Sequence, residues 1–310
     1  MRSIEVGWRI PEFPVTGRGG PEFIEQILRS LESVEHDFDS AWLSDHMIPW
    51  ADWQNPATDN LEAWTTVSYL MGVFRRLSFG HIVLCNSYRN PALLAKMAAT
   101  LSCLAPGRFI LGIGAGWKQD EYASYGYDFP SASARVGALR EGVQIIRRMW
   151  TEESVNFEGK YYKIKDAYCN PKPKPIPPIM IGGSGEKLLL KLVASQADWW
   201  NMLGQVDEYQ RKSSILRSHC EKVGRDYNSI RKTWLGCISI AEDQKEAERI
   251  ARSSPFTASE VTVTGNVEQV TRKLKEYANV GVTYFILRFL DFPSLKGATL
   301  FAENVLPQLK

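Results

Sequence analysis

Apolar segments of strand length alternate with segments of helical periodicity along nearly the whole 310-residue chain. Eight such strands are expected, at residues 4–10, 40–44, 77–84, 109–113, 179–182, 197–201, 233–240 and 281–288. Strands that are separated by helices pair in parallel through right-handed crossovers. Eight units in a chain of this length are typical of a (β/α)8 barrel, and we predict this α/β fold. A doubly wound sheet is the alternative, although it would not need eight regular repeats.

Helices and long loops are expected between the strands. The helices fall at residues 21–35, 61–74, from Pro91 to a stop at 105–107, and at 134–150, 186–194, 206–223 and 300–306. Three segments do not fit a bare barrel and are expected to be insertions: a polar loop at 49–60, a hairpin and proline-rich run at 152–178, and an irregular piece at 253–265. Because no linker or tandem repeat interrupts the alternation, residues 1–310 are interpreted as one TIM-barrel domain.

Composition excludes several classes of partner. The net charge of +2 favours neither nucleic acid nor an anionic membrane surface as a partner. The sequence contains no signal-peptide core and no run of about 20 apolar residues. The five cysteines form no CxxC pair, which argues against a zinc site and against a disulfide framework. We therefore expect a soluble, cytoplasmic protein without a metal site.

A glycine-rich loop follows the fourth expected strand. Residues 112–117 read Gly-Ile-Gly-Ala-Gly-Trp. Gly114, Ala115 and Gly116 let the backbone come close to a ligand. Trp117 and the nearby Tyr122 offer flat apolar surface. The spacing differs from the GxGxxG dinucleotide fingerprint, so a flexible turn is an equal alternative for the loop taken by itself.

Polar residues stand at the carboxyl ends of the expected strands, where barrel enzymes keep their sites. Asp45 and His46 follow the second strand, Trp50 comes four residues later, and Cys85 and Asn86 follow the third strand. A lone histidine is more often structural than catalytic, although the position of His46 beside Asp45 at a strand end strengthens the case for a catalytic role. For Cys85 a packed, inert thiol is favoured, because the sequence ties no base to it.

A second glycine-rich loop follows the fifth expected strand. Gly182, Gly183, Ser184 and Gly185 would direct successive backbone N–H groups, together with a helix N-terminus, at one point. That geometry binds phosphate. The alternative is a tight turn without a ligand, and barrel phosphate sites are commoner after the last two strands. Arg288 adds a polar residue at the end of the eighth strand.

Several segments, in order along nearly the whole chain, resemble the bacterial-luciferase-like superfamily of flavin and deazaflavin oxidoreductases. The resemblance is closest to the branch that uses coenzyme F420. It rests on SDHMIPW at 44–50, YRNPALLAKMAATL at 88–101, GRFILGIGAGWKQDEYASYG at 107–126, IIRRMWTEE at 145–153, FEGKYYKIKDA at 157–167, PPIMIGGSGEK at 177–187 and GVTYFILRF at 281–289. The family fold is a (β/α)8 barrel with insertions, which agrees with the strand count, and its cofactor ring lies at the barrel mouth.

The resemblance implies roles for single residues. Asp45 and His46 match the pair that deazaflavin-dependent sugar-phosphate dehydrogenases hold beside the ring, and Trp50 matches their active-site tryptophan. Trp117 stands where those enzymes carry a catalytic glutamate, which argues against sugar-phosphate oxidation and leaves the general acid or base open.

The resemblance also implies how the cofactor is held. A non-prolyl cis peptide that supports the ring would fall at Ile82-Val83, and the loop at 182–185 matches the family's phosphate-binding loop. The expected catalytic residues are His46 and Trp50. The expected cofactor-binding residues are Asp45, His46, Ile82, Val83, Cys85, Asn86, Gly114, Ala115, Gly116, Trp117, Tyr122, Gly182, Gly183, Ser184 and Gly185.

The implied reaction is hydride transfer between F420 and a small organic substrate, with His46 polarising or protonating the atom that gains charge. One alternative is an FMN-dependent monooxygenase that uses reduced flavin and molecular oxygen. Another is a flavin-binding protein without turnover. The resemblance further implies a homodimer, and the sequence does not identify the substrate.

Overall fold

The computed structural model describes residues 3–15, 19–258 and 260–310. Within these residues, eight parallel strands close into a barrel in the order β1, β2, β3, β5, β8, β9, β10, β12. Their bounds are β1 Glu5–Arg9, β2 Ser40–Leu43, β3 Ser78–His81, β5 Phe109–Gly114, β8 Ile179–Gly182, β9 Trp199–Met202, β10 Arg231–Ile240 and β12 Tyr284–Phe289. Because β12 pairs back to β1 and β9 pairs with β10, the sheet has no break. The predicted (β/α)8 barrel is confirmed, and the doubly wound alternative is wrong.

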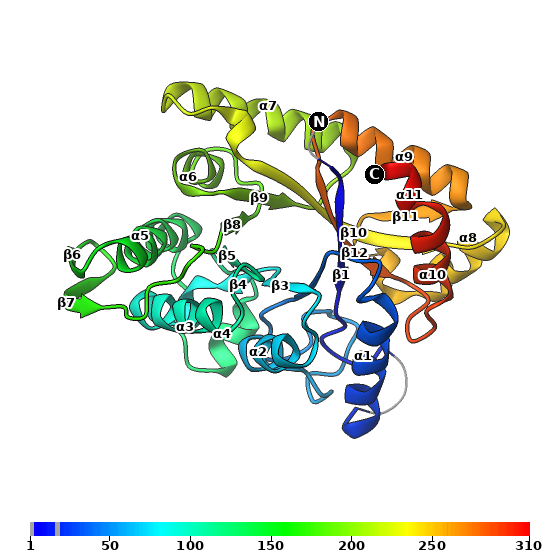
Figure 1. Ribbon diagram of the computed structural model, residues 1–310, viewed down its shortest axis with the longest axis horizontal. Coiled ribbons are helices and arrows are strands. Elements are labelled where there is room, and N and C mark those ends of the chain that lie inside the picture. The colour runs from blue at the N-terminus through cyan, green and yellow to red at the C-terminus, as the bar shows by residue number, and fades with distance from the viewer. Residues whose placement is uncertain (1–2, 16–18, 259) are drawn as a thin grey trace.

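Helices surround the strands on all sides (Figure 1). They are α1 Pro21–Val34, α2 Ala63–Val73, α3 Pro91–Leu104, α4 Gln119–Ser124, α5 Ala132–Thr151, α6 Leu189–Gln196, α7 Val206–Lys222, α8 Gln244–Ser253, α9 Val267–Asn279, α10 Lys296–Asn304 and α11 Leu306–Leu309. In α1 the buried side chains include Phe23, Ile27 and Leu31, the spacing of one helix face, and each contributes about 1.5 to 3 kcal/mol by burial. None of the helices in the described part of the chain is long and apolar enough to span a membrane.

The barrel strands separate two cores because successive side chains point to opposite faces. The outer core lies between strands and helices and includes Val6, Leu111 and Phe285. The inner core fills the barrel. It comprises Trp42, Ile82, Ile110, Met180, Leu235, Tyr284 and Ile286, with Val83 and Trp199 packed against it. The barrel interior is therefore packed with side chains, and ligands must bind at its ends.

Trp42 fills the inner core because a glycine on each adjacent strand leaves room for its ring. A Cβ at Gly7 would lie 2.4 Å from its indole nitrogen, and a Cβ at Gly80 would lie 2.3 Å from a ring carbon. The indole N–H donates to the Ser40 hydroxyl at 2.6 Å. Small residues on β1 and β3 thus make room for one large side chain on β2.

Two expected elements differ from the structure near the site. The third strand is not continuous over 77–84, because a cis peptide between Ile82 and Val83 divides it into β3 and β4 (Leu84–Cys85). The helix after the second glycine loop begins at Leu189, three residues later than expected, since residues 186–188 form a turn.

The carboxyl-terminal third holds more regular structure than expected. Residues 253–265 are not irregular throughout, because they contain the short helix η3 (Pro255–Ala258) and the strand β11 (Thr262–Gly265), which extends the sheet beside β10. Residue 259 of this segment lies outside the described residues. Helices α8 and α9 flank the segment, and the strand expected from residue 281 begins at Tyr284.

The other two insertions lie outside the barrel. Residues 49–60 contain turns and bends but no helix or strand. Residues 152–178 contain an antiparallel hairpin of β6 (Ser154–Glu158) and β7 (Lys163–Tyr168), and then a proline-rich run with cis bonds before Pro171 and Pro175. The hairpin is tied to α5, because the Glu141 carboxylate accepts hydrogen bonds from three backbone amides of its turn, those of residues 160–162.

Candidate active site at the carboxyl end of the barrel

The expected site residues gather at the carboxyl ends of neighbouring strands. Asp45 and His46 follow β2, Cys85 ends β4, the first glycine loop follows β5, and the second follows β8. Parallel pairing places these ends at one mouth of the barrel. Residues that are up to 140 positions apart in the chain, such as Asp45 and Gly185, thereby come to one side of the molecule.

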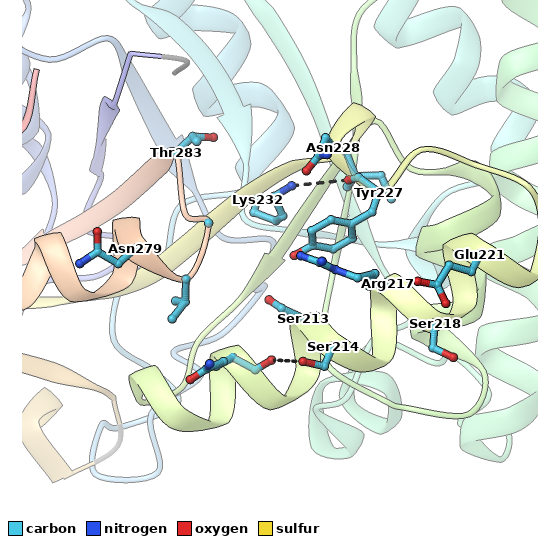
Figure 2. A pocket seen from close by; sticks show the side chains of 14 residues that line it. Ser213, Ser214, Arg217, Ser218, Glu221, Tyr227, Asn228, Lys232, Asn279 and Thr283 are labelled. Atoms are coloured by element: carbon cyan, nitrogen blue, oxygen red, sulfur yellow. Dashed lines mark hydrogen bonds between the residues drawn. The ribbon is translucent and has the colours of Figure 1, made fainter.

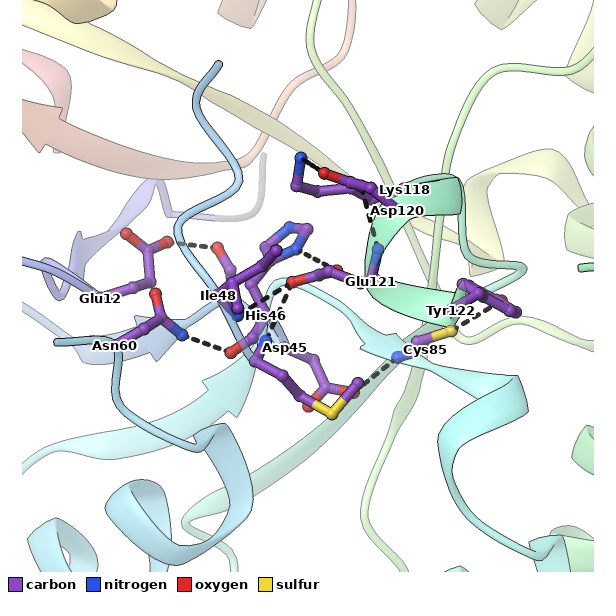
Figure 3. A network of polar contacts seen from close by, with 12 residues as sticks. Glu12, Asp45, His46, Ile48, Asn60, Cys85, Lys118, Asp120, Glu121 and Tyr122 are labelled. Atoms are coloured by element: carbon purple, nitrogen blue, oxygen red, sulfur yellow. Dashed lines mark hydrogen bonds and ion pairs between the residues drawn. The ribbon is translucent and has the colours of Figure 1, made fainter. Parts of the chain in front are cut away.

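His46 is fixed by a buried carboxylate that the sequence did not identify. Its Nδ1 atom lies 2.9 Å from Oε2 of Glu121 in α4, whose side chain is 1% exposed (Figure 3). The other carboxylate oxygen accepts hydrogen bonds from the backbone amides of Met47 and Ile48 at 2.9 and 3.3 Å. Since a carboxylate only accepts, Nδ1 carries a proton. The Nε2 atom has no hydrogen-bond partner among the described residues, and the imidazole is 13% exposed.

Helical phase explains why Glu121 was missed. Asp120 and Glu121 both follow the first glycine loop, and the sequence alone does not say which of them turns inward. In the structure Asp120 faces outward and accepts from Lys118 at 2.7 Å, whereas Glu121 faces the loop after β2. The sequence feature that could have indicated Glu121 is the pair of acidic residues that closely follows the first glycine-rich loop.

Asp45 has three donors of its own. Its carboxylate accepts the Cys85 amide at 2.8 Å and two hydrogen bonds from the Arg89 guanidinium at 2.7 and 2.9 Å. Arg89 also pairs with Glu62 at 2.7 Å. Burial alone would lower the pKa of Arg89, but Asp45 and Glu62 raise it above its usual range. Asp45 therefore holds the strand end at Cys85 in place, and its contact with a cofactor stays a prediction.

The cis peptide shapes the mouth between β3 and β8. The bond between Ile82 and Val83 is cis, at the position that the family resemblance implies. The bulge is accommodated by glycines on the next strands, because a Cβ at Gly114 or Gly182 would lie 2.7 or 2.9 Å from a Val83 methyl group. Val83 itself is partly exposed. The bulge thus presents an apolar side chain at the mouth, between two glycine-lined strands.

The side chains of Cys85 and Asn86 each form a hydrogen bond with a tyrosine hydroxyl of the protein. The Cys85 thiol is buried and shares a 3.0 Å hydrogen bond with the Tyr122 hydroxyl. Burial raises the pKa of this thiol, so it stays protonated at neutral pH, as expected of an inert thiol. The Asn86 amide donates to the hydroxyl of Tyr162 in the hairpin at 2.9 Å. Tyr122 is fully buried below Gly116, whose φ of 79° suits glycine.

Two expected tryptophans lie beside His46 in different environments. The Trp117 ring meets the imidazole edge-on, with 5.7 Å between the ring centroids, and is 62% exposed. The Trp50 ring lies 6.5 Å from the imidazole and packs against Phe13 and Phe256. Trp117 is therefore open to solvent at the mouth, whereas Trp50 belongs to an aromatic cluster.

A buried ion network lies under Trp50. Glu12, which is fully buried, pairs with Arg9 at 3.1 Å and with Arg288 at 3.0 Å, and Arg9 pairs with Glu260 at 2.6 Å. Burial alone would raise the pKa of Glu12, but Arg288 and Arg9 hold it well below its usual range. Sequence reasoning named only Arg288. The two arginines and two glutamates balance in charge.

The second glycine loop offers fewer free amides than expected. The Gly183 amide donates to the Asn201 carbonyl at 2.9 Å, so it is not available to a ligand. The amides of Ser184 and Gly185 have no acceptor among the described residues. Lys212 of α7 lies beside them and donates to the Ser184 carbonyl and to Glu186. The loop still presents successive amides and a nearby cation.

A separate groove of about 800 Å³ lies at the opposite end of the barrel (Figure 2). Its lining includes Arg217 of α7, Lys232 at the start of β10, and Thr283 just before β12. None of the expected site residues lines it, and the amino-terminal end of a barrel serves stability more often than catalysis. In the part of the chain that the structure describes, no group of three His, Cys, Asp or Glu side chains could hold a metal ion.

Comparison with known proteins agrees with this arrangement. An F420-dependent glucose-6-phosphate dehydrogenase from Kineococcus radiotolerans is 29% identical over 91% of this chain and 91% of its own. Among solved structures, an F420-dependent secondary alcohol dehydrogenase is similar with a TM-score of 0.83 and 21% identity, over 99% of both chains. A monooxygenase from Streptomyces bottropensis has a TM-score of 0.81 and 19% identity, over 99% of this chain and all of its own. These two structures support the fold.

Family membership is shown by a match that covers most of the chain. The model of the luciferase-like monooxygenase family matches residues 5–279, which include every barrel strand except β12. The chain therefore belongs to the luciferase-like monooxygenase family.

Proposed function

We propose that the protein is an F420-dependent oxidoreductase that transfers a hydride between the deazaflavin and a small organic substrate. The curated relatives, which span nearly the full chain, are F420-dependent dehydrogenases. The observation that carries the proposal is the position of His46. One ring nitrogen is anchored by Glu121, and the other has no partner among the described residues at the barrel mouth.

The residues at the mouth fit a flat ring with a phosphate-bearing tail. The partly exposed Val83 at the cis bulge offers apolar surface to a ring face, and Gly114, which is buried, makes room for its side chain. The amides of Ser184 and Gly185, with Lys212 behind them, would receive a phosphate. When bound, the deazaflavin supplies or accepts a hydride through one ring carbon.

His46 would handle the proton of the same reaction. During oxidation of an alcohol, its Nε2 atom accepts the hydroxyl proton while the carbon loses a hydride, so that C–H and O–H bonds become a C=O bond. During reduction, the imidazolium returns the proton to oxygen. Glu121 keeps the proton on Nδ1 and fixes the ring plane, so Nε2 is the atom that faces the substrate. Trp50 would shield this side of the ring from water.

Cofactor choice is tested by titrating purified protein with F420 and with FMN and following intrinsic tryptophan fluorescence. We expect tighter binding of F420. Equal affinity, or purification with FMN bound, would favour the monooxygenase reading. Binding of F420 without turnover of any alcohol, ketone, enone or imine would favour a binding protein.

The role of His46 is tested by His46→Asn under cofactor saturation. The amide can replace a hydrogen bond but cannot transfer a proton at neutral pH. We expect F420 affinity to be largely kept and turnover to fall ~100- to 10,000-fold, or roughly 3 to 5 kcal/mol of barrier. Turnover at the wild-type rate would show that another group transfers the proton.

We also propose that the protein acts as a cytoplasmic homodimer. The dimer rests on the family resemblance, and the cytoplasmic setting rests on the composition of the sequence. Light scattering coupled to size-exclusion chromatography is expected to give twice the chain mass of 35.1 kDa. A mass of one chain at micromolar concentration would contradict the dimer.

A further inference from the structure

Trp117 has an unusual position for a large apolar side chain. It is 62% exposed although it contacts His46 at the end of a barrel strand. An exposed indole forgoes the hydrophobic gain of burial, and a substrate that covers this surface would recover that gain. Its indole stands edge-on to the imidazole, with an interplanar angle of 77°. The exposed Trp117 ring therefore lies directly beside the imidazole at the barrel mouth.

The cations around this surface already have partners, most of them carboxylates and, for Arg135, a backbone carbonyl and an aromatic ring. Arg9 and Arg288 hold Glu12 and Glu260 in a balanced network. Lys118, the residue after Trp117, is buried and pairs with Asp120 at 2.7 Å. Arg135 donates to the Gly116 carbonyl behind the loop and lies over the Phe129 ring. An anionic substrate would have to displace one of these partners, and the desolvation of its charge would then be poorly repaid.

From these observations we infer that Trp117 is the specificity-determining residue of the site and that the substrate is an uncharged molecule with an aromatic or extended apolar group next to its carbonyl. The carbonyl oxygen lies at Nε2 of His46, and the apolar group covers the Trp117 ring. This inference rests on the proposed function and names the substrate class of the same site. It sets the protein apart from a sugar-phosphate dehydrogenase, because the cations near the indole already have partners, which disfavours a dianionic phosphate.

The test compares three substrates at saturating reduced F420: 4-phenyl-3-buten-2-one, the smaller 3-buten-2-one, and an analogue of the first that carries a carboxylate on the phenyl ring. For the wild type, kcat/KM is expected to be highest for the neutral aromatic enone. Trp117→Ala is expected to lower the aromatic-to-small ratio of kcat/KM roughly 10- to 100-fold. Trp117→Phe should restore most of the ratio, because a flat apolar ring remains.

Trp53→Ala is the matched control. Trp53 is also exposed at the mouth, but it packs against Phe13 and Phe256, and no ring contact joins it to His46 among the described residues. It should leave the aromatic-to-small ratio unchanged. A second readout is independent of turnover: calorimetric binding of the saturated ketone 4-phenyl-2-butanone to protein loaded with oxidised F420. Trp117→Ala should weaken this binding by a similar factor, while the F420 affinity of each variant is measured separately.

The outcomes separate the inference from the proposed function. If F420 binds and enones turn over, but Trp117→Ala keeps the ratio or the carboxylated enone is preferred, the inference is wrong and the proposed function stands. An equal loss of ratio in Trp53→Ala would also overturn it, because the selectivity would then belong to the aromatic cluster. If F420 does not bind at all, the proposed function is wrong, and the inference that rests on it is wrong as well.

Discussion

Single residues at the mouth are held by partners that come from other elements. Glu121 of α4 positions His46, and Arg89 orients Asp45, so neither member of the Asp45–His46 pair depends on the other. Adjacent residues at a strand end thus have different tasks. His46 faces the mouth through Nε2, whereas Asp45 secures the backbone of β4 through the Cys85 amide.

Replacing Glu121 by glutamine should impair turnover by changing the imidazole tautomer. The amide oxygen can still accept from Met47 and Ile48, but the amide N–H₂ then faces Nδ1 of His46 and favours a proton on Nε2. We expect turnover to fall roughly 100-fold or more, as for other histidines held in the wrong tautomer. Imidazole ¹⁵N chemical shifts report the tautomer directly. Asp120→Asn, one residue away and outward-facing, is the control; equal losses in the two variants would contradict a positioning role.

His81 should make stability pH-dependent. It is fully buried and stacked on Trp64, and burial, aided by Arg89, lowers its pKa to about 3. The unfolded chain binds a proton near pH 6.5 and the native protein does not, so stability falls as pH drops below 6.5. Between pH 6.5 and 5 this loss is ~2 kcal/mol. Urea unfolding at these two pH values checks it, and His81→Phe, which keeps the stack, should lose much less; equal losses would refute the assignment.

At the scale of elements, the loop between β8 and α6 decides how a phosphate is bound. Gly183 has a φ of 123°, and a Cβ there would lie 2.4 Å from a Leu189 methyl. A valine at this position would therefore strain the fold as well as block a ligand. Gly185 suits a test better, since its Cβ would make an ordinary 3.5 Å contact.

Gly185→Asp should weaken F420 binding while the melting temperature changes little. The added carboxylate would stand where the phosphate is expected and repel it. We expect F420 affinity to fall roughly 10-fold, about 1.4 kcal/mol, as measured by fluorescence titration. Gly185→Ala is the uncharged control and should bind almost normally. If Gly185→Asp binds as well as Gly185→Ala, the loop is a turn that contacts no phosphate.

The sequence predicted the elements whose apolar pattern faces the core and missed those that depend on distant partners. The barrel strands were recognisable because both of their faces are buried. Strand β11 is short and polar and exists only because the second half of β10 is free to pair with it. The start of helix α9 was predictable from the capping box of Asn266 and Gln269, but this helix was not among those expected from the sequence. Glu121 could not be assigned because its partner His46 lies 75 residues away. Glu12 could not be assigned because Arg288, its second partner beside the nearby Arg9, lies 276 residues away.

At the scale of the whole molecule, one ion network joins the two ends of the chain. Glu12 follows β1, Arg288 lies in β12, and Glu260 precedes β11, so the network ties the closing strand pair of the barrel to the segment beside it. The Ser44 hydroxyl of the loop after β2 also donates to Glu12. Because all these groups are buried, removal of one carboxylate leaves two guanidinium groups facing Glu260 alone.

Glu12→Gln should therefore lower the free energy of unfolding by roughly 3 to 5 kcal/mol, the cost of breaking a buried ion pair. Urea unfolding at pH 7 measures this loss. Glu268→Gln, which removes the exposed partner of Arg272, should cost less than about 1 kcal/mol.

The role of Glu12 also predicts how stability changes with pH. The native pKa of Glu12 is depressed, so its contribution is present above the unfolded value of 4.5 and is lost as pH falls toward the native pKa. Wild-type stability should thus drop below pH 4.5 more steeply than that of Glu12→Gln, because the variant has no carboxylate to protonate at this position. Parallel acid profiles, or a loss at pH 7 no larger than that of Glu268→Gln, would mean that the network does not hold the barrel closed, and that the apolar cores carry its closure alone.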